Sequence, residues 1–169
     1  MRRIRVVHRT PIAEFANVVS TYRDAVYRVW LITPWIGSYK DGSVDPLQVL
    51  IDAFRANPTC MVNVITRRPQ ANATWHQDAL RLLRDNVAHT LFFCDTLHTK
   101  LYLIETGGMV AAMLGSPNLT AGGNSGNKEL ALELRTTSLT GTDEVSSTVQ
   151  DLVEYARDLL ADDSVRIAT

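Results

Sequence analysis

The sequence contains little cysteine, and neither its cysteines nor its histidines follow a metal-binding pattern. The two cysteines, Cys60 and Cys94, lie far apart, without CxxC or Cys–His spacing. No two histidines have the i,i+4 spacing of a helical metal site, and no HxE…CxxC pattern is present. These absences argue against a disulfide framework and a structural zinc site. We therefore expect two buried free thiols, no bound metal and no cofactor.

Long hydrophobic runs are also missing. No stretch approaches the roughly 20 apolar residues that a transmembrane helix requires. The basic N-terminus, MRRIRVVHRT, has neither the apolar stretch nor the small-residue cleavage site of a secretory signal. We therefore expect a soluble, cytoplasmic protein.

A strong charge of either sign is absent as well. The formal net charge is −1 at pH 7, so any nucleic-acid binding must come from a local basic patch, which argues against a protein that simply coats DNA. With 46% hydrophobic and 21% charged residues, the composition is that of a globular protein. The length of 169 residues suits one domain with a real core, and we assign residues 1–169 to a single domain.

What the sequence does contain is an alternation of helical and strand patterns. Apolar residues at helical spacing predict four helices, with Asp45 and Asp143 at the starts of two of them, over about residues 11–25, 46–56, 75–83 and 145–160. Apolar and β-branched stretches predict strands over 27–32, 61–66, 90–94, 100–104, 109–114 and 129–134. This order predicts an α/β fold with a mixed sheet, parallel at first and antiparallel later, flanked by helices on both faces.

Five side chains suited to phosphate chemistry lie at predicted strand ends. His98 and Lys100 stand two apart at the start of one predicted strand, so alternation places them on the same face. Ser116 and Asn118 follow the next strand, and Glu129 opens the one after it. An imidazole can attack or donate a proton, an ammonium and an amide can hold a phosphate, and a carboxylate can orient the imidazole.

This pattern resembles the HxKx4D…GSxN signature of the phospholipase D superfamily. The matching residues are His98-x-Lys100-x4-Glu105, the GSPN of 115–118 and Asn127-x-Glu129. Upstream, VWLITPWI (29–36) and VNVITRRP (62–69) are similar to strand-and-loop segments of the family. Glu105 replaces a family aspartate that tends to be structural, so we leave it outside the catalytic set. The spacer from Glu105 to Gly115 is longer than usual, which affects the hairpin and not the groups that contact phosphate.

The resemblance implies a metal-independent mechanism that needs two histidines. In this family two HxK motifs face each other: one histidine forms a phosphohistidine and the other protonates the leaving oxygen. Only His98 is followed by a lysine two residues later. We therefore expect a homodimer with its active site on the twofold axis. Glu129 is expected to orient the His98 ring, while Lys100, Ser116 and Asn118 of both chains hold the phosphate.

Several of these residues also have a simpler interpretation. Ser116 could be only a turn residue, and Asn118 could cap a following helix, although capping and phosphate contact can coexist. Arg67 and Arg68, just after a predicted strand, either grip flanking phosphates or form an exposed solvated pair. Trp35 either stacks on a nucleobase or packs in the core or an interface. Arg67, Arg68 and Trp35 are thus the candidate nucleic-acid contacts.

The favoured function is an endonuclease that cleaves DNA or RNA. The chain is short with a single motif, and its GSPNLT…GNKE segment resembles nuclease domains found alone or fused to helicase and restriction modules. A helicase or a restriction or defence protein is therefore a candidate partner, by analogy alone. Two alternatives stay open. A hydrolase of phospholipids or other small phosphodiesters needs an apolar groove beside His98, and a non-catalytic nucleic-acid-binding or assembly subunit does not need the full catalytic set.

Overall fold

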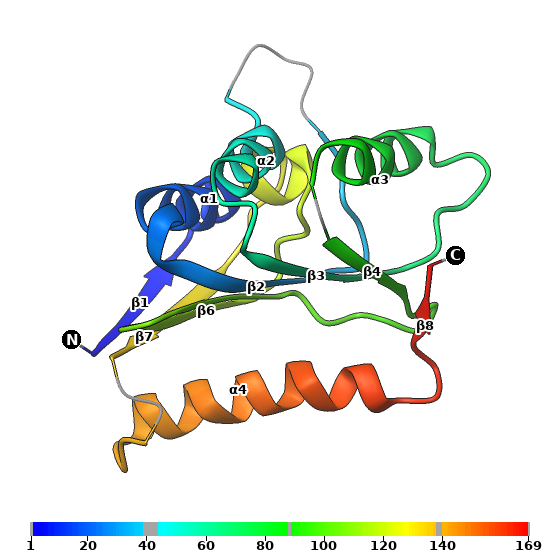
Figure 1. Ribbon diagram of the computed structural model, residues 1–169. Helices are drawn as coiled ribbons and strands as arrows, with labels where there is room; N and C mark the ends of the chain where they lie inside the picture. The colour runs from blue at the N-terminus through cyan, green and yellow to red at the C-terminus, as the bar shows by residue number, and fades with distance from the viewer. Residues whose placement is uncertain (1, 39–43, 88, 138–139, 169) are drawn as a thin grey trace.

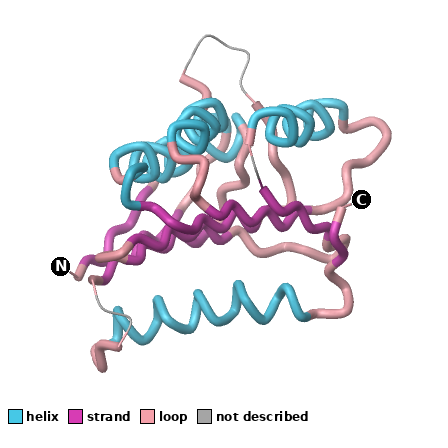
Figure 2. Tube along the Cα trace, viewed as in Figure 1, coloured by secondary structure: helices cyan, strands magenta, loops and turns pink. Residues whose placement is uncertain are grey.

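The computed structural model describes residues 2–38, 44–87, 89–137 and 140–168, which form three layers (Figure 1). A sheet of eight strands, counted over these residues, forms the middle layer (Figure 2). One face of the sheet is covered by α1 (Pro11–Thr21), α2 (Pro46–Ala56) and α3 (Thr74–Asn86). The other face is covered by α4 (Glu144–Ala161).

The sheet combines a parallel half and an antiparallel half, in the order β1-β7-β6-β5-β2-β3-β4-β8. The parallel strands are β2 (Val26–Ile32), β3 (Met61–Thr66) and β4 (His89–Phe93). Antiparallel pairing adds β5 (Leu101–Thr106), β6 (Val110–Gly115), β7 (Ala131–Thr136) and β1 (Arg3–Val7) on one side, and β8 (Arg166–Ile167) on the other. The predicted mixed sheet, with helices on both faces, is confirmed.

Apolar side chains fill both spaces between the sheet and the helices. In β2, Val29 and Leu31 belong to the core shared with α1, α2 and α3, whereas Trp30 and Ile32 belong to the core under α4. Successive side chains of a strand point to opposite faces, and this alternation divides the two cores. The central strand β5 is buried along its whole length, as expected where both faces are covered.

Two helices begin where the sequence predicts. The Asp45 carboxylate accepts a hydrogen bond from the backbone N–H of Leu47 at 2.9 Å and caps α2. The Asp143 carboxylate accepts one from Ser146 N–H at 3.2 Å and caps α4. In the described part of the chain, no helix combines the length and apolar character needed to cross a membrane.

The sequence pattern does not predict β1 or β8, and it places the start of β7 too early. In β1 the apolar Ile4 and Val6 are each 60% exposed, while Arg5 lies on the more buried side and pairs with Glu133 at 2.6 Å. Because the apolar side chains face outward, hydrophobic periodicity does not predict this strand. Because β7 begins at Ala131, Glu129 lies in the segment before the strand instead of opening it.

Candidate active site

The predicted catalytic residues come from segments that meet at one edge of the sheet. Ile32, at the end of β2, is opposite Leu101 at the start of β5, and Leu101 is opposite Leu114 near the end of β6. Gly115 is in turn opposite Ala131, the first residue of β7. The segments that precede β5, follow β6 and precede β7 therefore share this edge. They carry His98 and Lys100, Ser116 and Asn118, and Glu129, respectively.

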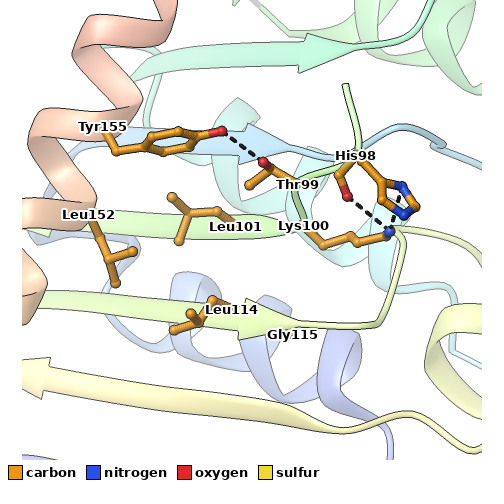
Figure 3. Close-up of a pocket in the computed structure, with 8 residues that line it drawn as sticks. All are labelled: His98, Thr99, Lys100, Leu101, Leu114, Gly115, Leu152 and Tyr155. Atoms are coloured by element: carbon orange, nitrogen blue, oxygen red, sulfur yellow. Dashed lines mark hydrogen bonds between the residues drawn. The ribbon is translucent and has the colours of Figure 1, made fainter. Parts of the chain in front are cut away.

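His98 and Lys100 lie in the segment just before β5, not within the strand. Lys100 Nζ donates a hydrogen bond to the backbone oxygen of His98 at 3.0 Å and lies 3.4 Å from the ring nitrogen Nδ1 (Figure 3). The His98 side chain is exposed, whereas Lys100 is half-buried. The ammonium therefore places a positive charge beside an accessible imidazole.

Glu129 is held by Ser116 and Asn127. The Ser116 hydroxyl donates to one oxygen of the Glu129 carboxylate, and the Asn127 amide donates to the other at 3.2 Å. The Leu130 N–H donates to the Ser116 oxygen at 3.1 Å, which ties the end of β6 to the start of β7. Ser116 is thus more than a turn residue. Within the described residues these hydrogen bonds engage Glu129, and none joins it to His98, so its orientation of the His98 ring stays a prediction.

Asn118 is fixed by two buried residues that the sequence pattern does not single out. Thr33, after β2, donates its hydroxyl proton to the Asn118 side-chain oxygen at 3.2 Å. The Tyr102 hydroxyl donates to the backbone oxygen of Pro117 at 2.9 Å, and burial raises the pKa of this hydroxyl, which keeps it protonated. Because the amide oxygen of Asn118 is engaged, its NH2 group is the part suited to donate to a phosphate.

Gly123 lies very close to the backbone of Asn118. A Cβ atom on Gly123 would lie 2.7 Å from the backbone nitrogen of Asn118, closer than real Cβ contacts allow. The side-chain oxygen of Asn118 contacts Thr33, and its backbone oxygen accepts from the N–H of Thr120 at 2.8 Å. Capping of the following helix by Asn118 stays an interpretation from the sequence.

A groove of about 570 Å³ begins at His98 and Lys100 and continues toward α4. Its other walls are largely apolar, and Figure 3 labels the residues that line it, with His98 and Lys100 at one end and Leu152 and Tyr155 of α4 at the other. Thr99 and Tyr155 join their hydroxyl groups at 2.7 Å across one side of the groove. The further lining residues are Leu101, Leu114, Gly115 and Leu152. An apolar surface therefore begins directly beside the candidate nucleophile.

Arg67 and Arg68 contact different parts of the protein. Arg67 Nε donates to the backbone oxygen of Leu97 at 2.7 Å, and its guanidinium lies 5.7 Å from the centre of the Trp35 ring. Arg67 therefore supports the segment that leads into His98. Arg68 is exposed, and its guanidinium lies 3.7 Å from the Asp95 carboxylate. Neither the predicted contact with flanking phosphates nor the base stacking by Trp35 is tested by these positions.

Glu105 lies at the far end of β5 from His98 and is 1% exposed. Its carboxylate accepts hydrogen bonds from the Trp30 indole at 3.0 Å and from the Tyr27 hydroxyl at 3.2 Å. Arg157 of α4 lies 3.4 Å from the same carboxylate. These contacts tie α4 to the sheet and agree with a structural role for this residue.

The two cysteines are buried and free, as predicted. Burial raises the pKa of the Cys60 thiol to about 11, so this thiol stays protonated near neutral pH and is a poor nucleophile. No cluster of three or more His, Cys, Asp or Glu side chains suited to a metal ion occurs among the described residues.

No family model and no curated protein matches the chain, but solved structures share its fold. Nuc from Salmonella typhimurium, a phospholipase D family member, has a TM-score of 0.68 at 13% identity, over 99% of each chain. NucT from Helicobacter pylori has a TM-score of 0.61 at 15% identity, over 95% of this chain and 97% of NucT. Polyphosphate kinase from Porphyromonas gingivalis has a TM-score of 0.60 at 15% identity, over 95% of this chain and 26% of the kinase. These likenesses confirm the phospholipase D-type fold that the motif predicts.

Proposed function

From the phospholipase D-type fold as a premise, we propose that this chain is a metal-independent phosphodiesterase, specifically an endonuclease acting on DNA or RNA. We propose further that His98 carries a phosphohistidine intermediate in a site shared by two copies. The observation that carries the proposal is the convergence of an imidazole, an ammonium, a hydroxyl, an amide and a carboxylate at one sheet edge. Binding alone does not require this complete set.

The proposed reaction has two displacements. In the first, a ring nitrogen of His98 attacks phosphorus, a P–N bond forms, the P–O bond breaks, and the partner subunit's His98 gives a proton to the leaving oxygen. In the second, water attacks phosphorus and returns a proton to that partner imidazole as the P–N bond breaks. One imidazole cannot serve both faces of an in-line displacement, so a second is required.

Lys100 and Asn118 are assigned to the phosphate oxygens. The Lys100 ammonium lies next to the His98 ring, and the Asn118 NH2 group is suited to donate because Thr33 engages the amide oxygen. Donors fixed in advance stabilise the charge that develops on the phosphate during displacement. Ser116 supplies a further contact or positions Glu129 through its hydrogen bond.

A second copy is the occupant that we propose for the surface around His98. Leu130, whose N–H binds Ser116, is 59% exposed, and Tyr155, whose hydroxyl binds Thr99 next to His98, is 40% exposed. Covering such apolar surface contributes about 25 cal/mol per Å². A twofold contact here would bury these side chains and bring the partner subunit's His98 opposite the first.

Phospholipid or another small phosphodiester is the second candidate substrate, because the groove beside His98 has apolar walls from Leu114 and Leu152. The fold alone does not choose between substrates. Nucleic acid is preferred because the chain carries a single motif with nuclease-like surroundings and because Arg67, which is followed by Arg68, contacts the segment that leads into His98. This chain has a net charge of only −1, so its own electrostatic attraction to DNA is weak. A partner such as a helicase or a restriction module would supply additional affinity for DNA.

The test is a cleavage panel in excess EDTA, with plasmid, single-stranded DNA, RNA and phospholipid vesicles as separate substrates. We expect nucleic-acid cleavage by the wild type and a loss of more than about 1,000-fold in His98→Ala, as for other essential catalytic groups. His89→Ala, which removes a histidine at the start of β4, toward the opposite end of the sheet from His98, is the matched control and is expected to retain activity. Cleavage of vesicles alone would favour the lipid hydrolase, and binding of nucleic acid without cleavage would favour the non-catalytic subunit. Loss of all activity in EDTA would contradict the metal-independent mechanism.

A further inference from the structure

A hollow lined by two tryptophans adjoins the candidate active site on the side of Asn118. Its volume is about 330 Å³, and none of the described residues that line it carries a charge. The walls include Trp35, Trp75, Gly37, Thr120 and Gly122 together with Asn118. Asn118 therefore belongs both to this hollow and to the proposed phosphate site.

Two aromatic rings form the principal walls. Trp35 comes from the segment after β2, and Trp75 from the first turn of α3. Their ring centres are 6.0 Å apart, with the planes tilted by 58°. Trp75 is 47% exposed, so a large part of a flat apolar surface faces solvent beside the site.

The tryptophans rest on a buried histidine that holds them in place. His76 is fully buried, and its ring lies edge-on to Trp35 with centres 5.5 Å apart. One ring nitrogen of His76 lies 2.9 Å from the backbone oxygen of Ile36, and the other lies 3.1 Å from that of Arg67. Aromatic side chains held in advance lose little entropy when a flat ligand stacks on them.

Gly37 leaves room for the Trp75 ring. A Cβ atom at Gly37 would lie 2.9 Å from Cε3 of Trp75, so any larger residue would force the ring to move. The neighbouring backbone is also fixed, because the Gly37 N–H donates to the Leu119 oxygen at 2.8 Å. The hollow is thus tied by backbone hydrogen bonding to the residue that follows Asn118.

We propose that this hollow is a nucleobase subsite, and that the enzyme prefers single-stranded nucleic acid. This inference rests on the nuclease function proposed above. A nucleotide whose phosphate contacts Asn118 would place its base against Trp75 and Trp35. A hollow with aromatic walls and no charged side chain among its described lining residues suits a flat neutral base better than a phosphate or a charged headgroup. A base can enter only if it is unpaired and unstacked, so paired DNA is the poorer ligand.

The test measures coupling between the bases and Trp75 in a binding experiment without cleavage. The His98→Ala protein and the His98→Ala, Trp75→Ala double variant are each titrated with an oligothymidylate and with a base-free deoxyribose phosphate chain of equal length. We expect Trp75→Ala to weaken oligothymidylate binding by about 10-fold and to leave binding of the base-free chain unchanged. Trp75→Phe should restore most of the loss, and a hairpin duplex should bind the parent more weakly than the single strand.

Tyr22→Ala is the matched control, because Tyr22 is an exposed aromatic residue at the end of α1. It should leave binding of both chains unchanged. Equal weakening of both ligands by Trp75→Ala, or no weakening of either, would overturn the subsite. Failure of the proposed function has a different result, since base-dependent binding would persist while the wild type cleaves no nucleic acid.

Discussion

At the scale of single residues, the site depends on buried side chains far from the motif in sequence. The motif predicts His98, Lys100 and Asn118, because their types and spacing are visible along the chain. It does not predict Thr33, which donates to Asn118 from another strand end, 85 residues earlier. Hydrogen bonds of this kind arise only when the sheet is assembled, so a pattern read along one segment misses them.

Thr33→Val tests whether this hydrogen bond prepares Asn118. Valine keeps nearly the same shape and removes the hydroxyl of the buried Thr33, leaving the half-buried Asn118 amide oxygen without this donor. We expect kcat/KM to fall by about 10-fold, with stability lowered by about 1 kcal/mol. Enzyme kinetics and urea unfolding measure the two effects, and Thr148→Val, on the exposed side of α4, controls for the substitution. Unchanged kcat/KM in a folded Thr33→Val protein would show that Asn118 needs no such support.

At the scale of elements, the sequence predicts those helix starts that a neighbouring side chain determines. The starts of α2 and α4 follow from Asp45 and Asp143, because helix capping is decided within a few residues. Strand β1 does not follow, since its burial depends on the partner strand β7 and on the pairing of Arg5 with Glu133. The loop position of Glu129 has the same origin, because the pairing of β6 with β7 sets where β7 begins.

The cap of α4 gives a pH prediction. Hydrogen bonds from Ser146 lower the pKa of the Asp143 carboxyl below its ordinary value of 3.8. This carboxylate therefore contributes stability above pH 3.8, and the contribution is lost as pH falls through the lower pKa of the folded state. Asp143→Asn retains a capping oxygen without this titration, so we expect its unfolding free energy to fall less between pH 5 and pH 2.5 than that of the wild type.

Urea unfolding at a series of pH values measures the difference. Asp151→Asn, in the middle of α4, controls for the general loss of one negative charge. Parallel acid profiles for wild type and Asp143→Asn would refute the role assigned to this cap.

At the scale of the whole molecule, the alternation of helices and strands predicts the α/β fold, since burial on one or two faces leaves a periodic trace. The exposed apolar surface around His98 has no corresponding pattern in the sequence. Leu130 and Tyr155 look like ordinary apolar residues in the sequence, and only the fold leaves them partly exposed beside the candidate site. We therefore predict that function belongs to a pair of chains, because each chain offers one His98 and the proposed reaction requires two imidazoles.

The most direct test of this claim mixes wild-type and His98→Ala chains in equal amounts, unfolded together and refolded so that they pair at random. If two chains share one site, only dimers of two wild-type chains are active. Random pairing makes these about one quarter of all dimers, so the mixture should have about one quarter of the activity of pure wild type at the same total protein concentration. Single-turnover cleavage at equal total protein measures this fraction. A value of about one half would mean that each chain acts independently, and it would contradict the shared site.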